Sequence, residues 1–223
     1  MLIISLTSIP PRYGQLPRVL HALRAQGADR VALVIPHTYA RFAQAPLPAL
    51  PDGVELLQTG TDLGPAGKLL APAAAYPGAD ILYCDDDWLY GPGWADALRA
   101  ARAPNQGSDR VVAASTWTTE RIGHMGGTVA QGFAGVLVAA DRAARIPPPP
   151  PEAWAADDIW LSGWFAGLGL AVTEAPAARG LATPLADPGA LQDSTDRDGA
   201  NRDGANRAAA ALIQGMFGTW PAG

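Results

Sequence analysis

Three consecutive aspartates, Asp85, Asp86 and Asp87, directly follow an apolar run that is typical of a buried β-strand. Adjacent carboxylates that lose hydration repel one another, so they require a compensating cation or a solvated mouth. In an extended chain, Asp85 and Asp87 would point to one side and Asp86 to the other. Their oxygens suit Mg²⁺ or Mn²⁺, which typically bind one or two carboxylates together with substrate phosphates. The triplet therefore predicts a metal site, and an ordinary acidic turn is the alternative.

Lys68 ends the block G-P-A-G-K at residues 64–68, which resembles a phosphate-binding loop. A Walker A motif would need Gly at position 62 and Ser or Thr at position 69, but the chain has Asp62 and Leu69, so ATPase chemistry is not supported. Helix N-termini and ammonium groups both favour anions, so Lys68 can donate to a diphosphate or a sugar. Lysine is rare in this arginine-rich chain, which favours a functional Lys68 over a solvated one.

Length and composition predict one globular domain over residues 1–223, because 48% of the residues are hydrophobic and can form a sizeable core. A net charge of -5, a pI near 5.1 and the lack of a basic cluster argue against a nucleic-acid polymer as partner. A single cysteine, Cys84, excludes an internal disulfide and a zinc cluster. Without a long apolar run or a signal segment, we expect a cytoplasmic protein with no transmembrane segment, and peripheral membrane contact stays open.

Strand-like and helix-like segments alternate along the first half of the chain, which predicts an α/β fold with a sheet packed between helices. We expect strands at residues 1–7, 30–36, 54–58, 79–84 and 111–115, and helices at 16–26, 66–76 and 94–102. The strand at 79–84 delivers the acidic triplet to the carboxyl end of the sheet, where ligands bind in open α/β folds.

The second half of the chain is less regular. We expect a glycine-led strand at 132–138, a helix at 154–168, a last strand at 170–173 and a terminal helix at 206–216. The pentapeptide R-D-G-A-N occurs twice in tandem at residues 197–206. Because it is rich in Gly, Asn and Asp, we interpret it as a turn-rich surface loop.

Four sequence blocks, in order along the chain, resemble the GT-A-fold glycosyltransferases, in particular small bacterial family-2-like members. They are S-L-T-S-I-P-P-R (5–12), L-G-P-A-G-K-L (63–69), Y-C-D-D-D-W-L-Y (83–90) and D-D-I-W-L-S-G (157–163), so the resemblance covers most of the chain. It implies a GT-A-like fold with a mixed, mostly parallel sheet flanked by helices. It also implies a nucleotide-sugar-binding half at 1–115 and an acceptor-side half at 116–223 with a flexible C-terminal loop and helix.

The resemblance also assigns donor-binding residues. The triplet matches the D-x-D motif, whose carboxylates hold a divalent cation, Mn²⁺ or Mg²⁺, against the diphosphate of a nucleotide sugar. By this match Asp87 is the main metal ligand, Asp85 faces the ribose or the metal through water, and Asp86 belongs to the same donor site. The exit of the first strand matches the nucleotide-binding edge of the family: Thr7, Ser8 and Arg12. For Ser8, a plain turn into the next helix is an equal alternative.

In inverting members of this family, a carboxylate on a helix near the acceptor takes the proton of the acceptor hydroxyl, and Asp157 and Asp158 match this position. The positive end of the helix dipole stabilises their ionised form. We favour Asp158 as the general base and keep Asp157 as the other candidate. An ordinary acidic first turn of an amphipathic helix is the alternative.

Several further residues keep more than one interpretation. Many family members have a third metal ligand, commonly histidine, near the C-terminus, but no histidine follows His124. Water, phosphate, Asp193 or Asp196 are the replacements. His124 itself, in a glycine-rich loop, can contact the acceptor, complete the metal shell or be solvated. Four tryptophans can stack on a sugar or pack in the core: Trp88, Trp117, Trp154 and Trp160.

The sequence thus predicts a metal-dependent glycosyltransferase that moves a sugar from a nucleotide-diphospho-sugar donor to a hydroxyl of a sugar or glycoconjugate acceptor, in bacterial glycan or glycoconjugate synthesis. Two alternatives stay open. A nucleotidyltransferase would use a similar metal site but attack the α-phosphate and release pyrophosphate. A noncatalytic nucleotide- or sugar-binding member is favoured by the missing C-terminal histidine.

Overall fold

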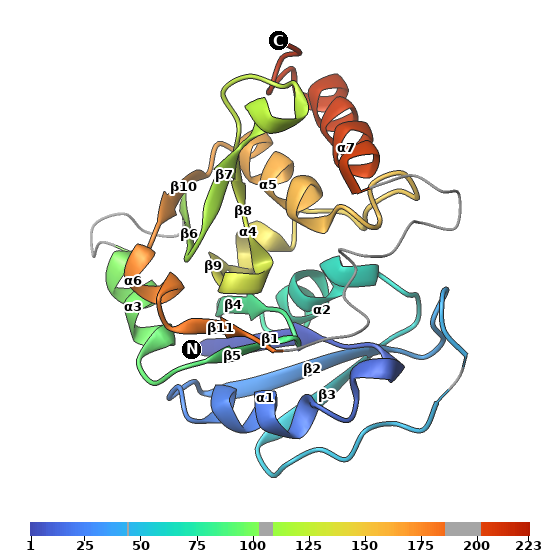
Figure 1. The fold of residues 1–223 in the computed structure, drawn as a ribbon, viewed down its shortest axis with the longest axis vertical. Helices are drawn as coiled ribbons and strands as arrows, with labels where there is room; N and C mark the ends of the chain where they lie inside the picture. Colours follow the sequence, from blue (N-terminus) through green and yellow to red (C-terminus); the bar gives the residue numbers. More distant parts are fainter. Residues whose placement is uncertain (44, 103–108, 186–201) are drawn as a thin grey trace.

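The computed structural model describes residues 1–43, 45–102, 109–185 and 202–223. At its centre is a seven-stranded sheet in the order β10-β6-β9-β4-β1-β2-β3 (Figure 1). Its strands are β1 (Leu2–Thr7), β2 (Arg30–Pro36), β3 (Val54–Thr59), β4 (Asp80–Cys84), β6 (Arg110–Ala113), β9 (Val136–Ala139) and β10 (Ala171–Glu174).

Most neighbouring strands of this sheet run parallel. β1 pairs in parallel with β2 on one side and with β4 on the other, β2 pairs in parallel with β3, and β6 with β10. Only β9, among the strands that the structure describes in this sheet, runs antiparallel to its neighbours β4 and β6. The predicted mixed, mostly parallel sheet is therefore confirmed.

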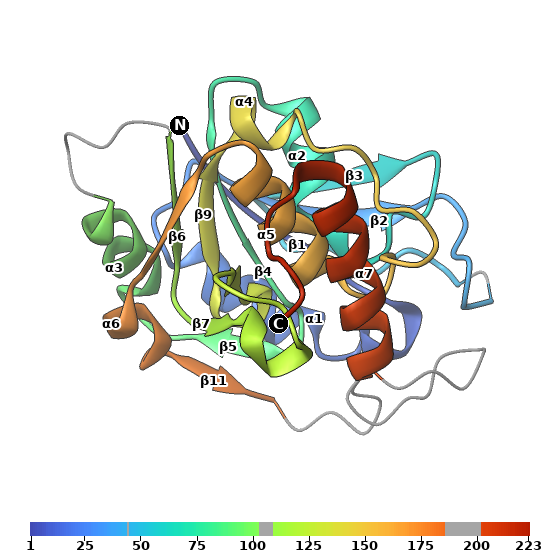
Figure 2. The ribbon, with the colours of Figure 1, turned by 90° about the horizontal axis from the view of Figure 1, so that it is seen from above.

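Helices cover both faces of the sheet (Figures 1 and 2), as parallel strands require. One face packs against α1 (Leu16–Arg24), α3 (Trp94–Ala101) and α6 (Pro176–Arg179), and the other against α2 (Gly67–Ala75), α4 (Ala140–Ala143), α5 (Asp157–Gly167) and α7 (Arg202–Phe217). Side chains alternate along β1, so Ile3 belongs to the core under α2 and Ile4 to the core under α1. Among the described helices, none combines the length and the apolar character needed to cross a bilayer.

The carboxyl ends of β1 and β4 lie side by side. The two strands are parallel neighbours, and Leu6 of β1 is the register partner of Cys84 of β4. Cys84 is fully buried, as its place at the end of an apolar strand predicts. The residues that follow the two strands, which carry most of the predicted donor-binding side chains, are therefore brought to one edge of the sheet.

Two short antiparallel ribbons were not predicted from the sequence. β5 (Trp88–Tyr90) pairs with β11 (Ala182–Pro184), and β7 (Thr116–Thr118) pairs with β8 (Thr128–Ala130). Strands of three residues are too short to show the two-residue alternation of apolar and polar side chains. They matter for the site, because β5 fixes the chain after the acidic triplet and β8 packs against α5, where the Ala130 N–H donates to the Ser162 hydroxyl.

The strand expected at 132–138 is divided in two. Residues Gly132–Ala134 form a 3-10 turn, and β9 begins only at Val136. Between them Gly135 has a φ of 107°, and a Cβ at this position would lie 2.3 Å from the Trp94 ring. Only glycine permits this conformation and this contact. The helix expected from residue 154 likewise begins later, at Asp157, after a series of turns.

The second R-D-G-A-N copy, residues 202–206, is not the surface loop that the sequence predicts, because it forms the first part of α7. The first copy lies outside the described residues. α7 packs closely on α5: a Cβ at Gly163 would lie 2.4 Å from the Ile213 side chain, and one at Gly167 would lie 2.7 Å from the Phe217 ring. This packing overrides the weak helix propensity of Gly and Asn, because most helix stability in proteins comes from tertiary contacts.

Candidate functional site

Ser8 and Arg12, which follow β1, bind the acidic triplet that follows β4. The Ser8 hydroxyl donates to Asp86 Oδ2 at 2.5 Å, and Arg12 Nη1 donates to Asp86 Oδ1 at 2.7 Å. Arg12 Nη2 lies 3.1 Å from Asp87 Oδ2. Burial raises the pKa of Asp86 to about 6, although Arg12 and Ser8 act in the opposite direction. The structure thus brings these four predicted residues together.

The expected alternation of the triplet is wrong. Asp86 and Asp87 both face the Arg12 guanidinium, whereas Asp85 is paired elsewhere. β4 ends at Cys84 and the next residues enter a turn, where the alternation of an extended chain no longer holds.

Lys68, at the start of α2, joins the triplet to α5. Its ammonium Nζ lies 2.5 Å from Asp85 Oδ1 and 2.8 Å from Asp157 Oδ2, and its side chain is only 3% exposed. Burial by itself lowers the pKa of Lys68, but the carboxylates of Asp157, Asp85 and Asp158 more than offset this and hold it well above its usual value. We call these four residues the Lys68 cluster. Its ammonium is charged and bound to the chain's own carboxylates.

Gly132 completes the surroundings of the Lys68 cluster. Its N–H donates to Asp158 Oδ1 at 2.9 Å. A Cβ at this position would lie 2.7 Å from Lys68 Nζ and 3.1 Å from Asp158 Oδ1, so the close approach requires glycine. Burial, followed by the neighbouring Asp157 carboxylate, raises the pKa of Asp158 to about 7. A carboxyl group with this pKa can accept or release a proton near neutral pH.

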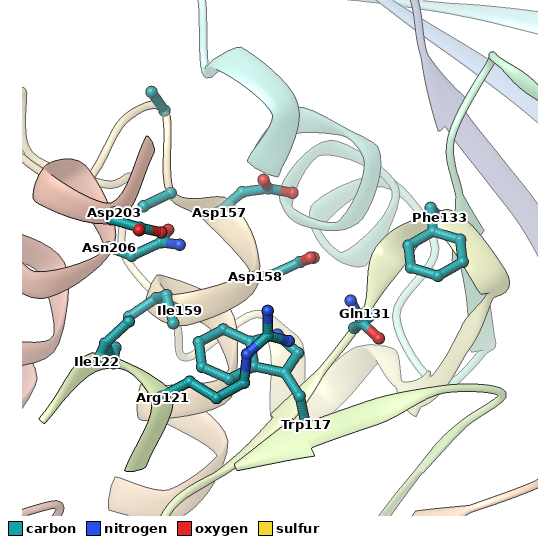
Figure 3. Close-up of a pocket in the computed structure, with 12 residues that line it drawn as sticks. Trp117, Arg121, Ile122, Gln131, Phe133, Asp157, Asp158, Ile159, Asp203 and Asn206 are labelled. Atoms are coloured by element: carbon teal, nitrogen blue, oxygen red, sulfur yellow. The ribbon is translucent and has the colours of Figure 1, made fainter. Parts of the chain in front are cut away.

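A polar cavity of about 390 Å³ opens beside this cluster (Figure 3). Asp157 and Asp158 line it from the start of α5, and Figure 3 shows Asp158 and Gln131 projecting toward one another. Its other polar and aromatic lining residues include Trp117, Arg121, Phe133, Asp203 and Asn206. Of these five residues, only Trp117 was a candidate in the sequence analysis. Asp203 and Asn206 belong to the R-D-G-A-N repeat, which was interpreted from the sequence as a surface loop.

Three of the four tryptophans named as stacking candidates lie elsewhere. Trp88 stacks on Phe133, with 4.4 Å between ring centroids, Trp154 donates a hydrogen bond to the loop after β3, and Trp160 is buried in the core. Only Trp117, among the four, lines the cavity. Core packing is the commoner duty of a tryptophan, and it applies to Trp160 here.

His124 and Thr7 also contact other parts of the chain. His124 is buried, and its Nδ1 is hydrogen-bonded to the Trp220 carbonyl at 2.7 Å, so the interpretation as a solvated loop residue is wrong. This contact fixes the glycine-rich loop to the C-terminal segment. The Thr7 hydroxyl donates to the Val34 carbonyl on β2 at 2.9 Å, and a role for Thr7 in nucleotide binding stays a prediction.

The predicted metal ligands Asp85 and Asp87 have side chains that are 32% and 20% exposed, and each is paired with a cation of the chain. Within the described part of the chain, no three acidic, histidine or cysteine side chains are grouped closely enough to hold a metal ion. Asp193 and Asp196 lie outside that part. Binding of a cation by Asp85 and Asp87 therefore stays a prediction.

Comparison with known proteins supports the fold. No family model matches the chain, and neither does any curated protein. Glucosyl-3-phosphoglycerate synthase from Mycobacterium tuberculosis, solved with phosphoglyceric acid, is similar with a TM-score of 0.57 at 13% identity, over 98% of this chain and 80% of that chain. A mannosyltransferase from Pyrobaculum calidifontis, solved with GDP-Man and Mn²⁺, gives a TM-score of 0.55 at 13% identity. The match covers 79% of this chain but only 55% of the length of the mannosyltransferase.

A further solved structure, 2-C-methyl-D-erythritol 4-phosphate cytidylyltransferase from Thermus thermophilus, gives a TM-score of 0.47 at 17% identity, over 96% of this chain and 98% of that chain. Identities this low concern the fold alone. Taken with the strand order and the helices on both faces of the sheet, the likeness to the two transferases shows that this chain has the α/β fold of the GT-A-type glycosyltransferases.

Proposed function

We propose that this chain transfers a sugar from a nucleotide-diphospho-sugar donor to a hydroxyl group of an acceptor. The observation that carries this proposal is the Lys68 cluster, in which one buried ammonium joins Asp85, at the end of β4, to Asp157, at the rim of the cavity. In open α/β sheets ligands bind beyond the carboxyl ends of strands. In this proposal the donor region and the acceptor cavity lie on either side of Lys68, an arrangement that supports group transfer between them.

The donor side is the edge formed by the residues after β1 and β4. Arg12 would bind a donor phosphate in exchange for its contacts with Asp86 and Asp87. The hydroxyls of Ser8 and Thr7 would likewise exchange their contacts with Asp86 and Val34 for a nucleotide. Asp85 and Asp87 would hold Mn²⁺ or Mg²⁺ together with the donor diphosphate, and such a cation would offset the charge that accumulates on the departing diphosphate. The mannosyltransferase of similar fold binds GDP-Man and Mn²⁺, which supports this assignment.

The acceptor side is the cavity, with Asp158 as the general base. In the transfer step the acceptor oxygen bonds to the anomeric carbon, the bond from that carbon to the diphosphate breaks, and the nucleoside diphosphate leaves with the electron pair. The acceptor proton passes to Asp158, whose Oδ1 is held by the Gly132 N–H. Asp157 is the positioning residue in this proposal, because its ion pair with Lys68 holds the start of α5.

The test is a panel of UDP, GDP, CDP and dTDP with and without Mn²⁺, read as the melting temperature, followed by turnover of the matching sugar donor. We expect a metal-dependent shift with one nucleotide, and release of the nucleoside diphosphate that accelerates when an acceptor is added. Release of pyrophosphate would instead indicate a nucleotidyltransferase. Binding of the donor without turnover, with every acceptor offered, would indicate a noncatalytic member.

A further inference from the structure

The cavity has one wall that comes from the sequence repeat. Asp203 and Asn206 belong to the second R-D-G-A-N copy and line the cavity from the first turns of α7. They are three residues apart, so their side chains lie on the same face of the helix. Figure 3 shows both on the α7 side of the cavity, beyond Asp157 and across from Gln131.

The helix that carries this wall is anchored on α5 by its later turns. Ala209, Ala210 and Ile213 of α7 are fully buried, and Phe217 packs edge to face on Trp164 of α5 at 4.8 Å between ring centroids. Because the same helix α5 begins with Asp157 and Asp158, the contact between the two helices also sets where the repeat stands relative to the proposed base. A preorganised arrangement of this kind lowers the entropy cost of binding a ligand.

The groups that face the cavity combine planar polar side chains with aromatic rings. Asp203 offers two acceptor oxygens, and Asn206 offers a donor and an acceptor. Gln131 accepts a hydrogen bond from Ser115 through Oε1 at 2.8 Å, and Figure 3 shows its amide nitrogen turned toward Asp158. The Trp117 ring supplies an apolar face. A sugar is complementary to this combination, because it has hydroxyl groups around its edge and C–H bonds on its faces.

The charge of the cavity restricts the ligand further. Three of its described lining residues are carboxylates, Asp157, Asp158 and Asp203, and one is a cation, Arg121, whose guanidinium lies 5.3 Å from the centre of the Trp117 ring. Lys68 is shared between Asp157 and Asp85, so it offsets only part of the carboxylate charge, and Asp158 with a pKa of about 7 carries a partial charge at neutral pH. The remaining negative charge disfavours an anionic ligand. A volume of about 390 Å³ lies within the range for small-molecule sites.

We propose that the second R-D-G-A-N copy is an acceptor-binding element, and that the acceptor is an uncharged sugar whose neighbouring hydroxyl groups are bound by Asp203 and Asn206. That the sugar acts as an acceptor rests on the proposed transferase function. That an uncharged sugar binds at this wall is inferred from the residues that line the cavity. The repeat thus supplies specificity, and Asp158 remains the residue that takes the proton.

The experiment measures binding of the methyl glycosides of glucose, galactose and mannose to the full chain by saturation-transfer NMR, without donor. The sugar 6-phosphates and uronic acids serve as anionic counterparts. We expect at least one methyl glycoside to bind and its anionic counterpart to bind less. Asp203→Ala should weaken this binding by about tenfold, the usual effect of losing a hydrogen bond to a charged group.

Two further variants keep the test sharp. Asp203→Asn retains the shape of the side chain and should weaken binding less than Asp203→Ala, and it replaces that variant if Asp203→Ala does not fold. Asp52→Asn removes one negative charge at an exposed position that does not line the cavity, and it should bind as the unaltered protein does.

Unchanged glycoside binding in both Asp203 variants would overturn the inference, as would tighter binding of the anionic sugars. Failure of the transferase proposal gives a different result, because then no nucleoside diphosphate shifts the melting temperature while glycoside binding through Asp203 persists.

Discussion

The two sides of the site are built in different ways. The proposed donor side follows directly from β1 and β4, two parallel neighbours, and its charged groups are already paired with one another through Arg12 and Ser8. The proposed acceptor side is assembled from short or irregular segments far apart in the sequence, which are β7, the turn at Gly132–Ala134, α5 and α7. A regular sheet edge therefore suits the constant part of a reaction, and an assembled cavity suits the part that varies with the substrate.

The largest expected effect concerns the acceptor side alone. Asp158→Asn should lower kcat by about 10²- to 10⁴-fold, because the amide cannot accept the proton of the acceptor hydroxyl. Asn still accepts the hydrogen bond from Gly132, so donor binding should be unchanged. The exposed Asp96→Asn is the control and should leave kcat as it was.

The pH profile gives an independent check of the same residue. The Asp158 carboxyl is protonated below its raised pKa of about 7 and cannot then act as a base. We therefore expect kcat/KM to fall as pH decreases through about 7. In Asp158→Asn this limb should disappear, and a limb that persists unchanged would assign the base elsewhere.

The next effect breaks the link between the two sides. Lys68→Met leaves Asp85 and Asp157 without their shared ammonium and should destabilise the fold by about 3–5 kcal/mol. The measurement is denaturant unfolding. Arg30→Gln is the matched control, since it removes one partner of the exposed pair with Glu55 and should cost about 1 kcal/mol or less. Equal costs for the two variants would mean that the Lys68 cluster is solvated.

A smaller effect separates the donor side from the acceptor side. Asp87→Ala should abolish the Mn²⁺-dependent stabilisation by the nucleoside diphosphate, which amounts to about 2.7 kcal/mol at a ligand concentration of 100 Kd. Binding of methyl glycosides in the cavity should not change. If the Mn²⁺-dependent shift survives in Asp87→Ala and also in Asp85→Ala, the assignment of these two carboxylates to the metal is refuted.

The smallest expected effect comes from a substitution at Gly132, where the chain passes close to the Lys68 cluster. Gly132→Ala places a methyl group against the Lys68 ammonium and should cost about 1–3 kcal/mol of stability through overpacking. It should also lower kcat, since it displaces Lys68 from Asp157. Gly14→Ala, where the added methyl group meets nothing within 4 Å, is the control. Thermal unfolding and steady-state kinetics on both variants measure the difference.

The same contrast explains which parts could be predicted from the sequence. The strands of the donor side show their apolar runs locally, and the triplet directly follows one of them, so their place at the sheet edge could be predicted. The pairing of Lys68 with Asp157 could not, because it depends on how α2 and α5 pack together. The direction of Asp87, on the same side as Asp86 rather than Asp85, was also missed, since the turn after Cys84 removes the alternation on which the prediction depended.

The acceptor side was predicted least well. Only Asp157, Asp158 and Trp117 of the cavity were named, and β7 and β8 were not predicted because three residues show no periodicity. The start of α7 was missed for another reason. The repeat has the composition of a turn, and its helical form depends on the contact of Ile213 with Gly163, which lies far from it in sequence.

Lys68 also has a consequence for ligand binding. One ammonium serves carboxylates of both sides, so a ligand that draws Asp85 away from it leaves that charge to Asp157 and Asp158. Thermodynamic linkage makes such an influence reciprocal. If the proposed function holds, donor and acceptor are therefore expected to bind interdependently, with an apparent affinity for each that changes with the concentration of the other.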